Sequence, residues 1–404
     1  MKKTLTLGLC LSAALLHSSM CGAQTVTPRI IIQEEELELR TDLTLLDDTA
    51  GTVTLTQEDR TIAVKIDGED FSVFHTDPKF PKPFFAPVRG PGGTVMTRPI
   101  DGLDAKPEDK LDHVHHKGIF LAVDEINGNQ HWAETSKIAN VSTEIIQEKG
   151  NPGVIDVVNQ WLDKDGERVA VTESTRIKIY ANRLVTYDIT FSAGEDMVEF
   201  EDTKEGMFGF RMIDSMRESV GGRVVNAEGL KGTAETWGKT SAWVDYVGEV
   251  DGKTFGVTIM DHPLNFRPSR YHVRDYGLFS VSPFGEKSYT NGDQPAAPAI
   301  IPAGGTLRLR YGMYIHAGDT EAADVDGVYR DYLAGDVPQA GNKAASTDAD
   351  SSAVIQSIDK LIEDSYEQAG EELEPSNEES AVFVDDCDCD PPRRHRRFRR
   401  CRGC

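Results

Sequence analysis

Leu184-Val-Thr-Tyr-Asp-Ile-Thr-Phe191 and Leu307-Arg-Leu-Arg-Tyr-Gly-Met-Tyr-Ile315 decide the fold class of this chain. In both stretches apolar and polar side chains alternate, which is typical of a β-strand with one buried face. Similar short runs, among them Thr61–Ile66 and Phe255–Met260, recur between Ala50 and His316, and we find no helix of three turns among them. Asp-Gly and Asn-Gly pairs separate the runs, as tight hairpins require. The sequence therefore predicts an all-β fold, a large antiparallel β-sandwich.

The composition excludes several classes of protein. The 404 residues include 43 Lys and Arg against 67 Asp and Glu, a formal net charge of -24, which argues against nucleic acid as the main partner. After the N-terminal apolar run no stretch reaches the roughly 18 apolar residues that a transmembrane helix needs. The P-loop, the G-x-S-x-G elbow and the H-E-x-x-H zinc motif are absent from the sequence, so the chemistry that depends on them is not expected.

The N-terminus has the pattern of a secretory signal. Met1-Lys-Lys3 is followed by the apolar run Leu5–Leu16 and by the small residues Cys21-Gly-Ala23, so we expect cleavage after Ala23. The mature protein is then exported, and is periplasmic or extracellular. Its body from Gln24 to Asp386 has no cysteine, so a Cys-ligated metal is not expected there.

The chain changes character after Gly318. Residues 320–333 predict one short helix that ends near Gly335. The last four cysteines suit either zinc or two disulfides, and the neighbouring arginines are a candidate contact for an anionic polymer. We divide the chain into a signal peptide (1–23), an N-terminal extension (24–50), a β-sandwich domain (51–335), and a linker, acidic segment with a candidate amphipathic helix and Arg/Cys-rich tail (336–404).

Asp112-His-Val-His-His-Lys117 is the densest polar cluster, and an apolar run follows it directly from Gly118. In an extended segment His113 and His115 point to one face and His116 to the other. Three imidazoles beside a carboxylate and an ammonium group provide either metal ligands or general acid/base groups. The alternative is a solvated strand start whose histidines hydrogen-bond loop carbonyls.

A second polar cluster, Asp202-Thr-Lys-Glu205, precedes an apolar strand that carries Arg211. A carboxylate beside Lys204 stays ionised and can act as a base. Arg211 can clamp a carboxylate or sugar hydroxyls. The alternative is a hairpin whose charges face water.

A third cluster, Asp261-His-Pro263, ends the strand Phe255–Met260, and Tyr271 and His272 follow it. Functional sites of β-sandwiches are often assembled on the loops after strands. Tyr271 and Trp132 are aromatic candidates for stacking on sugar rings, although such residues also serve as core or hairpin pairs.

Several motifs in one order, from about Gly51 to Gly318, resemble the bacterial PmoA family, whose members carry the label "methane oxygenase". The motifs are Asp112-His-Val-His-His-Lys-Gly118, Asn127-Gly128 with Trp132, Asp202–Arg211, Asn226-Ala-Glu-Gly229, Trp237-Gly-Lys239, Trp243-Val-Asp-Tyr246, Asp261-His-Pro263 and Tyr271–Phe279. Two positions depart from the family pattern: Val114 replaces a usual Pro, and Tyr271 a usual Trp.

The family label conflicts with the sequence, because a methane monooxygenase subunit spans the membrane several times and this chain has no predicted span after its signal. The resemblance implies instead an exported β-rich domain with a fold similar to galactose mutarotase. In that fold a histidine acid and a carboxylate base face a sugar, which is an analogy at the level of fold.

We therefore expect a protein that acts on a sugar or uronate by the acid–base chemistry of an epimerase, lyase or hydrolase. The candidate catalytic residues are His113, His115 and His116 as acids, with Asp202 or Glu205 as the base. The candidate substrate-binding residues are Lys117, Trp132, Lys204, Arg211, His262, Tyr271 and His272.

The rival hypothesis is a protein that holds a glycan or a metal without turnover. Its metal-dependent form would use His113 and His115 with Asp202, Glu205 or His262 as further ligands. Imidazoles and carboxylates suit zinc, iron and manganese alike, so the sequence does not identify an ion.

Overall fold

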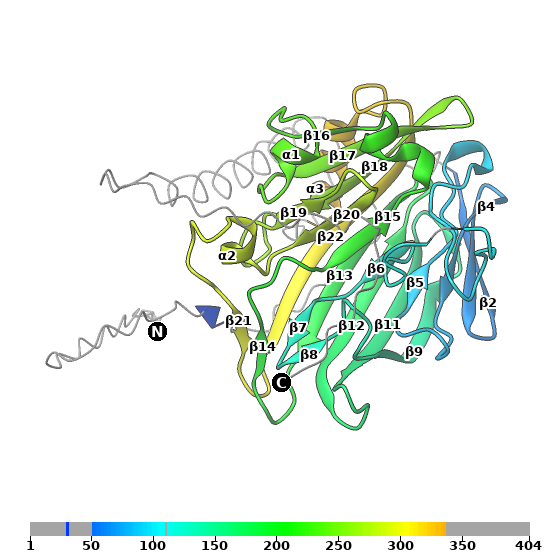
Figure 1. The fold of residues 1–404 in the computed structure, drawn as a ribbon. Helices are drawn as coiled ribbons and strands as arrows, with labels where there is room; N and C mark the ends of the chain where they lie inside the picture. Colours follow the sequence, from blue (N-terminus) through cyan, green and yellow to red (C-terminus); the bar gives the residue numbers. More distant parts are fainter. Residues whose placement is uncertain (1–29, 32–50, 110, 337–404) are drawn as a thin grey trace, which may run out of the picture.

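A computed structural model describes residues 30–31, 51–109 and 111–336 (Figure 1). The predicted signal peptide, most of the N-terminal extension and the segment from residue 337 onward lie outside the described residues. Among the helices of the described part, none is long and apolar enough to cross a membrane.

Strands dominate the described residues and form three sheets. The eight-stranded sheet has the order β16 (Arg223–Asn226), β17 (Trp243–Val250), β18 (Lys253–Asp261), β22 (Thr306–Ala317), β13 (Leu184–Ser192), β12 (Val169–Ile179), β11 (Gly153–Leu162) and β9 (Ile138–Gln147). The nine-stranded sheet has the order β10 (Lys149–Gly150), β2 (Val53–Glu58), β3 (Thr61–Ile66), β4 (Glu69–His75), β5 (Phe84–Phe85), β6 (Ile119–Leu121), β15 (Phe208–Arg211), β20 (Leu278–Ser282) and β19 (Arg270–Val273).

A small sheet and a few short helices complete the described structure. The small sheet has the order β1 (Ile30–Ile31), β21 (Ala299–Ile301), β14 (Val198–Phe200), β7 (Glu125–Ile126) and β8 (Asn129–Gln130). The helices are α1 (Thr233–Thr236), α2 (Glu286–Tyr289) and α3 (Val325–Asp336), with 3-10 turns at Pro91–Gly93, Asp214–Met216 and Glu218–Val220. In Figure 1 the three α-helices gather on the side of the molecule where β16 and β19 lie.

The two large sheets pack face to face, as period-two strands with one apolar face require. Phe208 of the nine-stranded sheet lies 4.7 Å from Tyr187 and 5.9 Å from Tyr311 of the eight-stranded sheet, measured between ring centroids. All three side chains are buried. The predicted all-β antiparallel sandwich is confirmed.

The hairpin chemistry predicted from the sequence is also present. At Asp67-Gly68, between β3 and β4, φ is 52° and 82°. At Asn127-Gly128, between β7 and β8, φ is 49° and 76°. Two successive positive φ values define the tight turn that matches the twist of the flanking strands.

Helix α3 covers the outer face of the eight-stranded sheet, where Tyr329 and Leu333 pack with Trp243 and Met260. The short C-terminal helix predicted from the sequence is therefore confirmed, but it begins at Val325 rather than Thr320. The helix starts later because the Thr320 hydroxyl donates a hydrogen bond of 2.6 Å to the buried Asp245 carboxylate. This bond holds the residues between Thr320 and Val325 in a turn.

Candidate functional site

Alternation along the central strands of the nine-stranded sheet determines which side chains face outward. Because Phe208 and Phe210 point into the core, Arg211 points to the opposite, outer face. On β19 the same rule sends Tyr271 into the core and His272 outward. Tyr271 is fully buried, and its hydroxyl donates to the Ile259 carbonyl at 3.1 Å. The structure therefore places Tyr271 in the core rather than at a sugar-stacking position.

The histidine cluster forms a turn instead of the extended segment expected from the sequence. The His116 amide donates to the His113 carbonyl at 2.9 Å, and His113 has φ 41°. As a result the His113 and His116 rings are nearly parallel, with centroids 5.1 Å apart, and do not point to opposite faces. Positive φ at a residue other than glycine is strained and is enriched at functional sites.

Asp112 joins this turn to the outer face of the sheet. Its Oδ1 atom accepts a hydrogen bond from Arg98 and another, of 2.7 Å, from Arg211 Nη2. Partial burial opposes ionisation of this carboxyl, but the guanidinium groups of Arg211 and Arg98 outweigh it and hold the pKa of Asp112 below its usual value. The other carboxylate oxygen lies 3.5 Å from His113 Nδ1 and orients that ring.

His113 is the most exposed imidazole of the cluster, with 45% of its side chain accessible to solvent. Its ring stacks on Tyr276 with centroids 5.2 Å apart and an interplanar angle of 4°. Tyr276 in turn lies over the Arg211 guanidinium, 5.0 Å from its central carbon. His113 therefore has one nitrogen near Asp112 and an accessible ring edge.

His115 and His116 are held neutral near pH 7. Burial, together with the nearby Lys82 ammonium, lowers the pKa of His115 to about 4. Burial lowers the pKa of His116 far below its usual value, and its Nδ1 accepts a hydrogen bond of 3.4 Å from Arg211. Neither ring is suited to act as a cationic acid at neutral pH.

Lys117 and Trp132 support the turn from beneath and do not face solvent. Lys117 Nζ donates to the Val114 carbonyl at 2.8 Å and lies 3.3 Å from Glu134 Oε1. The same carboxylate oxygen lies 3.0 Å from Lys82 Nζ, and burial lowers the pKa of Lys82 to about 8. Trp132 packs edge-on against the His116 ring at 5.3 Å. Both residues are placed as structural supports of the histidine turn.

Glu205 approaches the same outer face from the residues just before β15. It is half-buried, and burial raises the pKa of its carboxyl. The charges of Lys204, Arg274 and His113 act on this carboxyl in the opposite direction, whereas Asp124 adds to the rise. Glu205 and His113 adjoin the same end of β19 although 92 positions separate them in the chain, because Glu205 lies against His272 and His113 stacks on Tyr276 in the turn after that strand.

His272 connects Glu205 to Arg274. Its Nδ1 lies 3.6 Å from Glu205 Oε2 and 3.1 Å from the Lys204 carbonyl. Because Arg274 Nε donates to His272 Nε2 at 2.8 Å, the proton of the neutral ring is on Nδ1, which donates to Lys204. Burial lowers the pKa of His272 to about 3, so the ring stays neutral.

Asp112, Tyr276 and Arg274 were not among the candidate site residues chosen from the sequence, although Asp112 belongs to the first polar cluster. The alternation of β19 carried a usable signal, since residues 272 and 274 must share a face. For Tyr276 the sequence indicated only an aromatic side chain available for stacking, because this residue lies in the turn after that strand.

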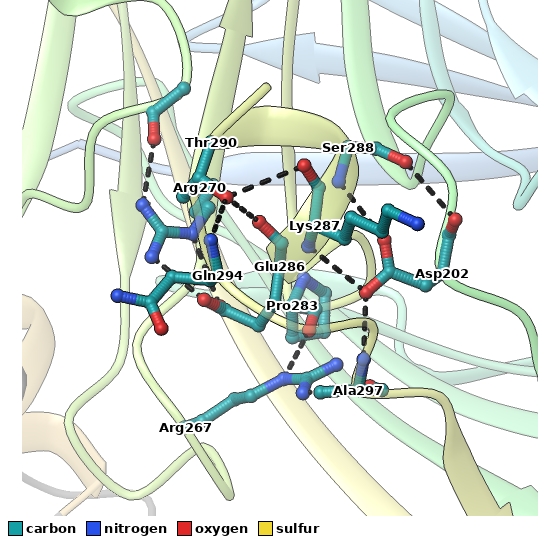
Figure 2. Close-up of polar contacts among 11 residues, drawn as sticks. Asp202, Arg267, Arg270, Pro283, Glu286, Lys287, Ser288, Thr290, Gln294 and Ala297 are labelled. Carbon is teal, nitrogen blue, oxygen red and sulfur yellow. Dashed lines mark hydrogen bonds and ion pairs between the residues drawn. The ribbon is translucent and has the colours of Figure 1, made fainter. Parts of the chain in front are cut away.

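Asp202 holds the loop that carries α2 in place (Figure 2). Its carboxylate accepts hydrogen bonds from the backbone amides of Lys287 at 3.2 Å, Ser288 at 3.1 Å and Ala297 at 2.9 Å. Two of these amides lie in the first turn of α2, so Asp202 acts as its capping carboxylate. The structure does not bring Asp202 together with the histidines, and its role as an alternative base is not supported.

His262 also lies apart from the cluster, after β18 of the other large sheet. It is 3% exposed, its Nδ1 accepts from the Leu264 amide at 3.1 Å, and its ring packs edge-on against Tyr332. Burial lowers its pKa to about 3. The structure therefore places His262 in the packing under α3 rather than near Arg211.

The metal-dependent hypothesis requires at least three ligand side chains at one point. In residues 51–109 and 111–336, no group of three or more His, Cys, Asp or Glu side chains is arranged to hold a metal ion. His113 and His115 are neighbours, with ring centroids 5.8 Å apart. Of the candidate further ligands, Asp202 accepts a backbone amide, Glu205 lies against His272 and His262 packs on Tyr332.

Sequence comparison supplies the family. The family of unknown function DUF6807 matches residues 61–330, about two thirds of the chain. The chain belongs to DUF6807. The resemblance to the PmoA family was therefore wrong: the match that covers the domain is to DUF6807, and short motifs in one order were not enough to tell the two families apart. A search of curated proteins found no match to this DUF6807 chain.

Several solved structures are similar to this DUF6807 chain. Galactose 1-epimerase from Lactobacillus acidophilus NCFM has 7% identity, covers 66% of this chain and 98% of that protein, and has a TM-score of 0.34. The GalM/aldose epimerase homologue from C. elegans has 6% identity, covers 67% and 100%, and has a TM-score of 0.29. GH36 alpha-galactosidase AgaA from Geobacillus stearothermophilus has 8% identity, covers 66% of this chain and 40% of that protein, and has a TM-score of 0.32.

Proposed function

We propose that this protein acts on a sugar or uronate by acid–base catalysis at the outer face of the nine-stranded sheet, with Glu205 as the base and His113 as the acid. The observation that carries the proposal is the convergence of these two groups from distant parts of the chain. Glu205 is half-buried with a raised pKa and lies 3.6 Å from His272 of β19, and the accessible ring of His113 stacks on Tyr276 in the turn that follows the same strand. Two proton-transfer groups at one face are the minimum for epimerase, lyase or hydrolase chemistry.

The surroundings of the pair suit proton transfer. Asp112, clamped by two buried guanidinium groups, holds one nitrogen of His113 and leaves the other for substrate. A carboxyl whose pKa is raised by burial is a stronger base once ionised than an exposed one. In the epimerase form, Glu205 takes a proton from the sugar, His113 returns one to it, and the two groups exchange roles on the reverse path, so that no proton is gained or lost.

The test is proton NMR in D2O with glucose, galactose, glucuronate and galacturonate. Anomer exchange, deuterium uptake at a sugar carbon and new vinyl signals report ring-opening, epimerase and lyase chemistry respectively, and p-nitrophenyl glycosides report hydrolysis. We expect Glu205→Gln and His113→Ala each to lower the rate about 10²-fold or more. Glu249→Gln, at an exposed position of β17, is the matched control and should keep the wild-type rate.

Two outcomes would count against the proposal. If both variants convert every sugar as fast as the wild type, the pair is not catalytic. If the wild-type protein binds a sugar, seen as saturation transfer to the ligand, but produces no exchange or product, the protein is a glycan-binding protein without turnover.

We also propose that the protein is exported, on the basis of the pattern of residues 1–23. Mass spectrometry of the mature protein from its native host should find an N-terminus at Gln24. A mature N-terminus at Met1 would contradict export by cleavage.

A further inference from the structure

The candidate site contains an arginine, Arg274, that the fold engages only through its Nε atom and a contact with the Trp237 ring. Arg98 and Arg211 share Asp112, and Arg270 of β19 gives Nε and Nη2 to the Glu286 carboxylate at 3.1 and 2.7 Å. Arg274, by contrast, uses only Nε, in its bond to His272. Within the described residues neither Nη group of Arg274 has a hydrogen-bond or ion-pair partner.

Arg274 is held in a fixed place. Its amide donates to the Leu278 carbonyl at 2.9 Å, and its own carbonyl accepts from the Gly277 amide at 3.1 Å and the Tyr246 hydroxyl at 3.2 Å. The side chain is fixed in addition, because Nε is bound to a buried histidine and the guanidinium carbon lies 5.3 Å from the centre of the Trp237 ring. A guanidinium restrained in this way loses little conformational entropy on binding a ligand.

The free edge of Arg274 is accessible and lies beside the proposed base. The residue is partly exposed, and no nitrogen of this side chain is buried without a partner, so both Nη groups reach solvent. His272 lies between the two groups: its Nε2 accepts a hydrogen bond of 2.8 Å from Arg274 Nε, and its Nδ1 lies 3.6 Å from Glu205 Oε2.

We propose that Arg274 binds the carboxylate of the substrate, so that the site selects uronates over neutral sugars. The inference rests on the proposed sugar site and deepens it by naming the substrate class. Two parallel N–H groups on a planar guanidinium match the two oxygens of a carboxylate. With Nε engaged by His272, the two Nη groups are the pair left for an incoming anion.

The experiment measures binding without turnover, by isothermal titration of the full chain with three uronates and their neutral sugars: glucuronate with glucose, galacturonate with galactose, and mannuronate with mannose. We expect at least one uronate to bind about tenfold or more tightly than its neutral counterpart. Arg274→Gln should abolish that preference and leave the affinity for the neutral sugar unchanged. Arg223→Gln, exposed on β16, is the matched control and should keep the preference.

Arg274→Gln removes the Nε group that donates to buried His272, so this variant could lose stability. A second variant and a thermal unfolding scan separate such a loss from a loss of binding. Arg274→Lys keeps the positive charge but not the pair of parallel N–H groups. It should retain a weaker preference for the uronate and melt close to the wild type.

Glucose 6-phosphate is titrated as a further ligand. If it binds more tightly than every uronate in an Arg274-dependent way, the anion is a phosphate and the carboxylate assignment is overturned.

The inference is also overturned if no uronate is preferred, or if Arg274→Gln keeps the preference. Its failure is distinguishable from that of the proposed function. Conversion of neutral sugars that depends on Glu205 would leave acid–base catalysis standing, whereas an Arg274-dependent uronate preference without conversion would leave only the binding site.

Discussion

Replacing Asp202 with alanine should reduce stability, and any loss of function should follow from that structural effect. The carboxylate accepts three backbone amides, of which those of Ser288 and Ala297 are partly buried and that of Lys287 is exposed. The exposed amide can bond to water instead, so its loss costs little. Each partly buried amide left without a charged acceptor costs about 1.5 kcal/mol, which makes about 3 kcal/mol for Asp202→Ala.

This loss is measurable by thermal and urea unfolding followed by circular dichroism. For a domain of this size a loss of about 3 kcal/mol lowers Tm by about 5 °C. Asp196→Ala is the matched control, because Asp196 is exposed in the connection between β13 and β14, and such a change should stay within about 0.5 kcal/mol.

The structural role of Asp202 also predicts a pattern across two variants. Asp202→Ala should lose stability, whereas Glu205→Gln should lose activity and keep its stability. The reasoning would be refuted if Asp202→Ala melted with the wild type but lost all activity, since Asp202 would then belong to the chemistry.

Three other changes follow from the same structure. Because burial raises the pKa of Glu205, its ionised form lowers the free energy of unfolding above the usual pKa of glutamate. Glu205→Gln should therefore resist urea at least as well as the wild type at pH 7. If the advantage of the variant grew at acidic pH, ionised Glu205 would stabilise the fold and the reasoning would be wrong. Gly118→Ala would place a Cβ 2.0 Å from the Phe85 carbonyl oxygen, so it should cost about 3 kcal/mol in urea unfolding, whereas Gly194→Ala, with nothing within 4 Å, should be nearly neutral. Lys82→Met removes a positive charge near His115, so the pKa of that histidine should rise in an NMR titration. It should remain below 6.5, because burial is the main cause of the lowered pKa. An unchanged pKa would show that Lys82 does not act on the ring.

The fold was largely predictable because its signals are local. Alternation in Leu184–Phe191 and Leu307–Ile315 reports one buried face, and both stretches lie in strands of the eight-stranded sheet. The Asp67-Gly68 hairpin follows from the ease with which these residues adopt positive φ. The start of α3 was less predictable, since a tertiary hydrogen bond from Thr320 to Asp245 delays it.

The candidate site was only partly predictable. The histidine turn and Glu205 stood out as dense polar clusters beside apolar strands. Asp202 stood out for the same reason and with equal strength, yet it accepts the backbone amides of a helical turn 86 positions away in the chain. Polar clustering in sequence does not distinguish a carboxylate that faces substrate from one that accepts backbone amides.

By itself, the sequence determined the strands, several of their hairpins, the balance of charge and the residue types available for proton transfer. The tertiary structure alone decided which of those residues meet. The alternation of side chains along a β-strand predicts that His272 and Tyr271 point to opposite faces, but not which of them points into the core. That choice depends on the order β6, β15, β20, β19, in which β15 pairs with two strands distant from it in the chain and Glu205 meets the His272 that binds Arg274. Such pairings depend on the packing of the whole sandwich, and no local pattern encodes them.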